Sequence, residues 1–150
     1  MKTIFWISIL IFLTQCGYTA LYKDNKNHNI KITLNKMSGN NQINELIKTE
    51  LKNYFKTDTQ NEYILKINTN FQKDIITKDA TGKPLEFRLK LTTNVNINFG
   101  EKNIETEFNE TFNIANSADT FELKKYENII KRNFAKSTKE KIIFKLVSLK

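Results

Sequence analysis

The stretch LEFRLKLTTNVNINF, residues 85–99, alternates apolar and polar side chains over fifteen residues. Successive side chains of a β-strand point to opposite faces, so a period of two indicates a strand with one buried and one solvated face. No other part of the sequence carries so strong a strand signal. The segments on either side of this stretch settle what kind of sheet it joins.

Two further strands flank it. Residues 62–77 alternate in the same way, and the turn at residues 79–84, which holds the only proline, separates them from it. Phe99-Gly100-Glu101-Lys102-Asn103 is a second tight turn, and residues 103–115 alternate again. Glu110 falls on the apolar side of this last strand, which predicts a bulge or a strand end near it. Turns this short predict an antiparallel meander of three strands.

A strand and a helix precede the meander, and a long helix follows it. Residues 29–37 alternate, and residues 38–41 form a turn in which an Asn can cap a helix predicted over residues 41–56. Residues 119–147 contain no glycine or proline and carry one apolar stripe with a polar gap at Thr138. They predict one long helix, either continuous or kinked or broken near Ser137-Thr138.

The predicted order is therefore β-α-β-β-β-α. A helix in the first connection allows the first two strands to lie parallel, so the sheet is mixed and four-stranded. Alternation in every strand leaves one apolar face, which both helices should cover, and this predicts an α+β two-layer sandwich. The other face is polar and poor in catalytic groups; it carries Lys66, Asn68, Asn70, Arg88, Lys90, Thr92, Asn94, Asn96, Asn98, Glu105, Glu107 and Asn109.

The N-terminal end has the layout of a bacterial lipoprotein signal. Lys2 precedes an apolar run at residues 4–13, and Leu13-Thr14-Gln15-Cys16 follows. At about 1.5 Å per residue the run is roughly 15 Å long, which is too short to span a bilayer core of about 30 Å comfortably. We expect a signal peptide at residues 1–15, a lipidated N-terminus and tether at residues 16–28, and one domain at residues 29–150. Gln15 replaces the usual small residue, so an ordinary secretory signal or an uncleaved anchor is the alternative.

Composition narrows the choice of partner. The formal net charge is +8, but the bias toward Lys, Asn and Ile is what an AT-rich genome imposes, whatever the function. In an exported protein this charge favours anionic lipid or lipopolysaccharide over nucleic acid. Cys16 is the only cysteine, so the sequence offers no intramolecular disulfide, and stability must come from a hydrophobic core.

The sequence offers no catalytic equipment. It lacks a glycine-rich phosphate loop, a Gly-x-Ser-x-Gly elbow and an HExxH motif. His28, the only histidine, lies in the predicted tether, where no cluster of ligands for a metal surrounds it. Glu105, Glu107 and Glu110 can line one face of a strand as in a glycosidase, but solvated strand carboxylates are far commoner. We expect a non-enzymatic binding or assembly component, with no cofactor besides a covalent lipid on Cys16.

Three motifs resemble the LptE family of outer-membrane lipopolysaccharide-assembly lipoproteins. The run Cys16-Gly17-Tyr18-Thr19-Ala20-Leu21-Tyr22 is similar to the family's mature start, with Ala20 in place of a usual proline. Asp79-x-x-Gly82-x-x-x-Glu86-Phe87-x-Leu89 looks like the turn between its central strands. Phe108-x-x-x-Phe112 before a long C-terminal helix is also similar, and the family has the same order of elements.

The resemblance implies a specific role. LptE-like proteins sit as a plug inside the LptD β-barrel, help it assemble, bind lipopolysaccharide and assist its delivery to the outer leaflet. This implies a lipid-anchored protein on the periplasmic side of the outer membrane. Lys78, Lys83, Arg88 and Lys90 are then candidates to bind lipid A phosphates, unless they merely solubilise a loop.

Two other functions remain open. One is a periplasmic adaptor or inhibitor lipoprotein that binds a protein partner through an edge of its sheet. The other is a disguised hydrolase that uses the three glutamates.

Overall fold

The strands and helices follow the order that the sequence predicts. A computed structural model describes residues 30–56, 59 and 61–149. The predicted signal peptide (1–15), Cys16 and the tether (16–28), with His28, lie outside the described residues and stay predictions. The described elements are β1 (Lys31–Gly39), α2 (Asn41–Leu51), the 3₁₀ turn η1 (Lys52–Tyr54), β2 (Glu62–Lys78), β3 (Pro84–Phe99), β4 (Lys102–Ala115) and α3 (Thr120–Val147).

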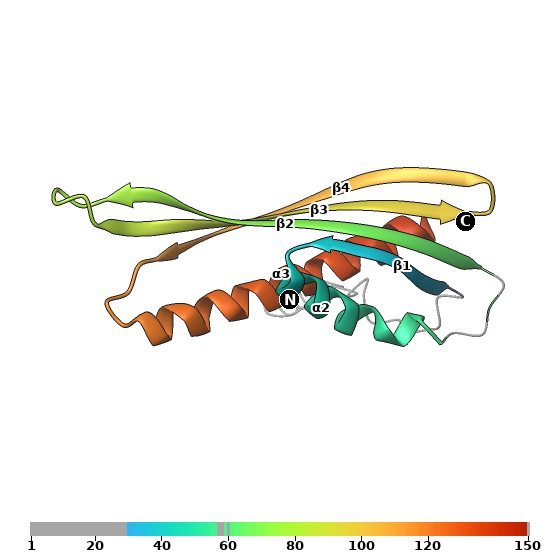
Figure 1. Ribbon diagram of the computed structural model, residues 1–150, viewed down its shortest axis with the longest axis horizontal. Helices are drawn as coiled ribbons and strands as arrows, with labels where there is room; N and C mark the ends of the chain where they lie inside the picture. The colour runs from blue at the N-terminus through green and yellow to red at the C-terminus, as the bar shows by residue number, and fades with distance from the viewer. Residues whose placement is uncertain (1–29, 57–58, 60, 150) are drawn as a thin grey trace, which may run out of the picture.

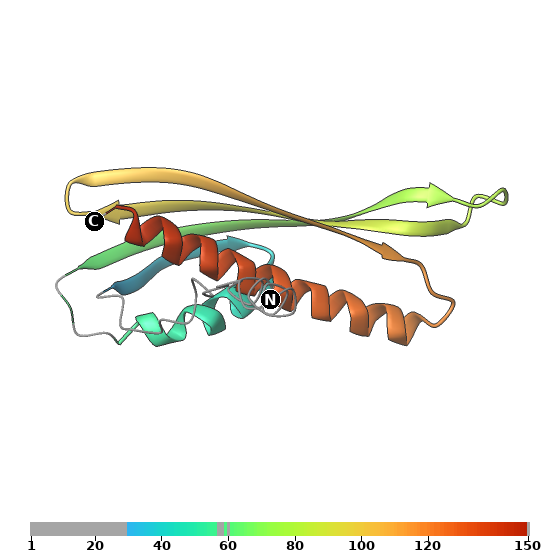
Figure 2. The same cartoon turned by 180° about the vertical axis from the view of Figure 1, so that it is seen from behind.

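The four strands form one mixed sheet in the order β1-β2-β3-β4. β1 pairs with β2 in parallel, because α2 carries the chain back between them, while β2, β3 and β4 pair antiparallel across tight turns. Both helices pack on the same side of this long, twisted sheet (Figures 1 and 2). The predicted α+β two-layer sandwich is confirmed.

The core lies between the two layers. Apolar side chains of all four strands meet those of α2 and α3 there, and Tyr63 of β2 is fully buried with its ring stacked on Phe99 at 4.4 Å. The Tyr63 hydroxyl donates to the carbonyl oxygen of Leu146 near the end of α3, at 3.2 Å. Burial raises the pKa of this hydroxyl above its ordinary value. No helix among the described residues is both long and apolar enough to cross a membrane.

A bulge in β1 changes which side chains face the core. The pairing with β2 shifts between Leu34 and Lys36, so that Lys36 pairs with Lys66 and Met37 with Ile67. Simple alternation would place Lys36 on the apolar side with Leu34, but the extra residue reverses the pattern. Met37 therefore packs against the core, and Lys36 lies exposed on the opposite face of the sheet.

The passage from β1 into α2 is held closely against β2. Gly39 adopts a φ of +92°, and the Asn40 amide donates to the carbonyl oxygen of Thr69 at 3.1 Å. Asn40 caps α2 as predicted, since its Oδ1 accepts from the Ile43 amide at 3.0 Å. The buried Asn44 accepts from the Thr69 hydroxyl at 2.8 Å. This polar cluster fixes the start of α2 on the sheet.

Both helices differ in detail from the prediction. The α-helical part of α2 ends at Leu51 and tightens into a 3₁₀ turn, which is common at helix ends, although Tyr54 and Phe55 still pack on the core. α3 runs from Thr120 to Val147 as one α-helix, so the continuous alternative is the one observed. Thr138 does not interrupt the helix, and its side chain is fully buried on the apolar face.

The predicted bulge or strand end at Glu110 is wrong. β3 and β4 pair without a register shift from Phe99–Lys102 to Glu86–Ala115. Glu110 does face the helix side, but side chains of α3 bind its carboxylate. Ser137 donates to its carboxylate at 2.7 Å, and Lys141 forms an ion pair with it. A charged side chain on the inner face therefore needs no break in the strand.

The sheet is longer than the layer beneath it. β2, β3 and β4 continue well past the end of β1, and only the N-terminal half of α3 runs under this overhanging part (Figure 1). The β2–β3 turn at the tip is tied together by Asp79, whose carboxylate accepts from the Thr81 hydroxyl at 2.6 Å and the Lys83 amide at 2.9 Å. These hydrogen bonds, the one from Thr81 above all, lower the pKa of Asp79.

Candidate functional site

The face of the sheet turned away from the helices, here called the open face, is a continuous polar surface. Its side chains form rows that cross β2, β3 and β4, because the strands pair in register. The rows are Lys66, Asn96 and Glu105; Asn68, Asn94 and Glu107; Asn70, Thr92 and Asn109; Gln72, Lys90 and Thr111; Asp74, Arg88 and Asn113. This matches the polar face that alternation predicts.

Neighbouring side chains on the open face bond to one another. Thr92 donates to Asn109 at 2.8 Å, and the Asn109 amide donates in turn to Glu107 at 2.7 Å. The Asn96 amide donates to Glu105 at 3.1 Å. The cross-strand pairs among them, Thr92–Asn109 and Asn96–Glu105, are of a kind that stabilises a sheet by roughly 0.2–1 kcal/mol each. The open face is therefore an ordered hydrogen-bonding surface.

A shallow groove of about 480 Å³ crosses the open face near the end of β1. It is lined by Lys36, Ser38, Lys66, Ile67, Asn68, Asn94, Val95, Asn96, Glu105, Thr106 and Glu107. Lysines lie along one side and glutamates along the other. Asn96 Oδ1 is buried in it without a hydrogen-bond partner among the described atoms. A polar ligand could satisfy that oxygen.

Lys36 and Lys66 are direct cross-strand partners in this groove. Like charges placed opposite one another are destabilising in a sheet, and a bound anion would relieve that repulsion. Sequence reasoning missed Lys36, because plain alternation assigns it to the core side. The bulge in β1 brings it here, and its sequence signal is the break in alternation at Lys36-Met37, where a lysine falls on the apolar side and a methionine on the polar side.

The four predicted lipopolysaccharide-binding residues fall into two places. Arg88 and Lys90 project from β3 onto the open face, where Arg88 Nε donates to Asn113 at 3.4 Å. Lys78 ends β2, and Lys83 lies in the exposed turn at the tip of the hairpin. None of the four forms an ion pair with an acidic side chain of the described residues.

The open face therefore carries two basic pairs at different places along its strands, Lys36–Lys66 and Arg88–Lys90. Lys66 and Asp74, the cross-strand partner of Arg88, are eight residues apart in β2, which is roughly 26 Å at about 3.3 Å per residue. A ligand that contacted both the Lys36–Lys66 pair and the Arg88–Lys90 pair would have to be long.

The three glutamates considered for hydrolysis are not brought together. Glu105 and Glu107 lie on the open face, whereas Glu110 lies on the helix side and is bound by Ser137 and Lys141. The three therefore do not line one face, because Glu110 is three residues from Glu107 and the period of a strand is two. Among the described residues, no group of three or more His, Cys, Asp and Glu side chains could hold a metal ion.

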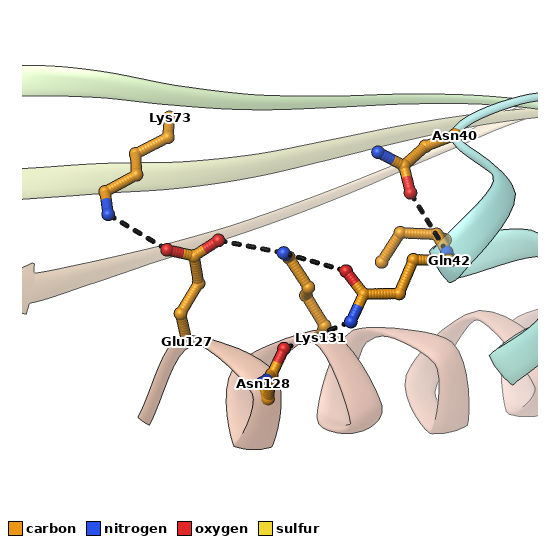
Figure 3. A network of polar contacts seen from close by, with 7 residues as sticks. Asn40, Gln42, Lys73, Glu127, Asn128 and Lys131 are labelled. Atoms are coloured by element: carbon orange, nitrogen blue, oxygen red, sulfur yellow. Dashed lines mark hydrogen bonds and ion pairs between the residues drawn. The ribbon is translucent and has the colours of Figure 1, made fainter. Parts of the chain in front are cut away.

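A polar network joins the overhanging sheet to both helices (Figure 3). Glu127 of α3 binds Lys73 of β2 at 2.9 Å and Lys131 at 2.8 Å, and Lys131 also donates to Gln42 of α2 at 3.0 Å. Gln42 completes the network by donating to Asn128 at 3.1 Å. The lysines also lie over aromatic rings, Lys73 over Phe87 at 4.5 Å and Lys131 over Phe71 at 4.7 Å.

This network sets the charge state of Glu127. Burial acts to raise the pKa of its carboxyl, but hydrogen bonds from Lys131 and Lys73, with their charges, outweigh that effect. The pKa of Glu127 is therefore lowered below its ordinary value of 4.5. The carboxylate remains ionised at neutral pH and ties the overhanging part of β2 to α3.

A second hollow, here called the β4 groove, lies between the end of β4 and the start of α3. Its volume is about 440 Å³, and Phe112, Ile114, Leu123 and Tyr126 contribute to its lining. Alternation and the helical stripe place Phe112 and Tyr126 on the core side, yet they remain 41% and 45% exposed. Other members of the predicted stripe are exposed as well: Ile129, Phe144 and Val147.

Comparison with known proteins finds solved structures of similar fold. No protein-family model matches the sequence, and no curated protein sequence does so. Among solved structures, the rare lipoprotein B of Shewanella oneidensis matches with a TM-score of 0.58 and 12% identity, over 77% of this chain and 96% of that one. A minor lipoprotein of Acinetobacter baumannii matches with a TM-score of 0.53 and 13% identity, over 78% and 93%.

Lipoprotein B of Nitrosomonas europaea is as similar to this chain as the Acinetobacter lipoprotein is. Its TM-score is 0.53 and its identity 13%, over 81% of this chain and 86% of that one. At identities this low the likeness shows a shared fold. The protein thus has the fold of these bacterial lipoproteins over nearly their full solved length.

Proposed function

We propose that the protein is an outer-membrane lipoprotein, anchored through Cys16 on the periplasmic side, that plugs an LptD-type β-barrel and assists lipopolysaccharide delivery to the outer leaflet. The observation that carries the proposal is the open face, a polar surface crossing three strands and backed by a packed helix layer. The lumen of a large barrel is wet and polar, so a plug must offer it hydrogen-bonding side chains. The fold shared with bacterial lipoproteins and the Leu-x-x-Cys16 signal support the same role.

Two pairs of basic residues supply contacts for lipid A phosphates in this proposal. Arg88 and Lys90 have no acidic ion-pair partner among the described residues, and Lys36 and Lys66 repel one another in the groove. Phosphate oxygens accept charge-assisted hydrogen bonds from both residue types. Lys78 and Lys83 at the tip of the hairpin extend the first pair.

The first experiment tests the partner and the anchor together. A C-terminally tagged full chain is recovered from detergent-solubilised outer membranes, and the co-purified proteins and the N-terminal peptide are identified by mass spectrometry. A stoichiometric LptD-type barrel and an acylated Cys16 are expected. The matched Cys16→Ser chain should lose the acyl group. A wild-type chain recovered alone and unacylated would refute the plug proposal.

The second experiment tests lipopolysaccharide binding by the purified full chain. The double variants Arg88→Gln/Lys90→Gln and Lys36→Gln/Lys66→Gln each remove two cations, and Lys48→Gln/Lys52→Gln removes two exposed cations from the helix side as a matched control. Loss of about 1.4 kcal/mol of binding free energy weakens binding about tenfold. We expect a loss of at least about that size in one or both open-face variants. A loss equal to that of the control would mean that only overall charge matters.

An adaptor or inhibitor lipoprotein that binds a protein through its sheet is the second candidate function. It would share the anchor and the fold but need no barrel. The long edge strand β4, which has no bulge and no proline, is the observation that favours it.

A further inference from the structure

β4 is an edge strand, because among the described strands it pairs with β3 alone. In an antiparallel ladder, alternate residues direct both backbone groups either toward the neighbouring strand or away from it. The amide of Asn116, just beyond β4, bonds the carbonyl of Leu85 at 2.7 Å, so the even-numbered residues face β3. In agreement, the carbonyl of Asn109 accepts from the Lys141 side chain at 3.3 Å. The odd-numbered backbone groups of β4 therefore face outward.

This edge lacks three of the features that usually protect an exposed strand: a bulge, a proline and a short length. Charged side chains, above all lysines and charges that point inward, also protect an edge, but the inward-facing Glu110 of β4 is neutralised by Lys141. β1, the other edge, is nine residues long and has a bulge near Lys36. β4 is fourteen residues long, has no proline, pairs with β3 without a bulge and carries one lysine, Lys102, at its first position. Of the outward-facing carbonyls of β4, Lys141 donates to that of Asn109 alone.

The β4 groove runs beside this edge. Its walls are the end of β4 and the first turns of α3, with Phe112 and Tyr126 in edge-to-face contact at 6.4 Å. Domains that bind peptides by strand addition use backbone hydrogen bonds for affinity and pockets for alternate side chains for specificity. An edge strand with an apolar groove at its side supplies both. The occupant it fits is the backbone of an extended chain.

The charges of β4 indicate which side chains the added strand should carry. Within a sequence of net charge +8, β4 carries three glutamates and one lysine. Glu105 and Glu107 project from outward-facing positions on the open face, so they would flank the side chains of an added strand. Opposite charges on neighbouring strands are stabilising. The added strand should therefore place Lys or Arg on that side.

We propose that β4 binds an extended segment of a partner protein as a fifth strand, with apolar side chains alternating into the β4 groove and basic or polar side chains on the open face. The segment takes the outward backbone groups of β4, including the Asn109 carbonyl now held by Lys141. Lys141 keeps its ion pair with Glu110. The proposal concerns an edge of the sheet and does not depend on the barrel or on lipopolysaccharide.

The test uses a display library of random linear eight-residue peptides, selected against the full-length protein in detergent. Thr111 is exposed and faces outward, so Thr111→Pro removes one edge N–H without removing a bond to β3. Thr111→Val keeps that N–H and is the matched control. Enriched peptides are synthesised, and their binding is measured with hydrogen exchange of the β4 amides as the footprint.

The expected peptides alternate apolar and polar residues and include lysine or arginine. They should slow exchange at odd-numbered β4 amides and bind Thr111→Pro at least tenfold more weakly than Thr111→Val. Tyr126→Arg, on the helix wall of the groove, should weaken binding with its fold intact, and this keeps the test decisive if Thr111→Pro does not fold. Failure to enrich any peptide, or a footprint away from β4, would overturn the proposal. So would self-association through β4 without peptide, since the occupant would then be a second copy.

Discussion

Among the three glycines that the structure describes, Gly39 is expected to be the least tolerant of a side chain. It adopts a φ of +92°, and a Cβ built on it would meet the carbonyl oxygen of Thr69 far inside van der Waals contact, with the Thr69 carbonyl carbon at 2.8 Å and the nitrogen at 2.9 Å. All three are backbone atoms, which no change of rotamer can move. Gly39→Ala must therefore separate β1 from β2 at the point where α2 begins.

The magnitude follows from two terms. A non-glycine residue at positive φ costs roughly 1–2 kcal/mol. Separation of the strands also disturbs the bonds from Asn40 to Thr69 and from Thr69 to the buried Asn44, and leaving such buried groups unpaired costs about 1–3 kcal/mol. The sum is about 2–5 kcal/mol, a large part of the roughly 5–15 kcal/mol that stabilises a typical domain.

Gly82→Ala is the matched control. Gly82 also has a positive φ, +84°, but a Cβ there would have no heavy atom within 4 Å, so the control carries the strain term alone, about 1–2 kcal/mol. Urea unfolding of both variants measures the difference directly, and a shared m-value would show that the same transition is compared. Equal losses for the two variants, to within about 0.5 kcal/mol, would refute the close approach of Gly39 to Thr69.

Three further changes test separate features. Glu127→Gln should lower the free energy of unfolding at pH 7 by about 2 kcal/mol. Because the pKa of Glu127 is lowered in the folded protein, the wild-type advantage is complete above pH 4.5, the ordinary pKa of a glutamate. The advantage should fade as the pH falls below that value. Urea titrations at pH 7 and pH 3.5 check this, and an advantage that persists unchanged at pH 3.5 would contradict it. Thr138→Val should raise stability by about 1 kcal/mol, measured as a higher Tm, since the buried Thr138 hydroxyl has no partner among the described atoms; a lower Tm would mean that the hydroxyl is bound after all. Asp119→Ala should cost about 1 kcal/mol by removing the acceptor of the Phe121 and Glu122 amides, with faster hydrogen exchange at those two amides, and Asp119→Asn, which can still cap, should restore both.

Sequence periodicity predicts the sheet well because the pattern of β3 is long and regular. Each residue from 85 to 99 has a fixed side once one of them is placed, and the turns at both ends leave a meander as the simple solution. Single-residue departures are where prediction fails. The bulge beside Lys36 is marked only by a break in alternation at Lys36-Met37, which is equally typical of the end of a strand. Glu110 was misjudged for the opposite reason, because a residue far along the chain, Lys141, neutralises a charge that looks misplaced in the strand.

The candidate site shows the same division. The open face was predictable, since a strand pattern assigns polar residues to it directly. Arg88 and Lys90 lie where alternation places them, on that face. The Lys36–Lys66 pair and the β4 groove were not predictable, because one depends on a bulge and the other on the angle at which α3 leaves the sheet. Sequence patterns say which side of an element a residue occupies, and they do not say what lies across from it.

The covering of the sheet by α3 has a consequence for how the chain matures. All four strands precede α3 in the sequence, and the hydroxyl of Tyr63 donates to a carbonyl oxygen of α3 that lies 83 positions later. At a synthesis rate of about 5–20 residues per second, the last helix takes roughly 1.5–6 s to appear after β4 is made. During that interval the apolar side of the meander lacks the cover of α3, and the core cannot be completed. If the chain is exported as proposed, this order of elements gives it time to cross the membrane unfolded, and holding chaperones would have an exposed strand surface to recognise.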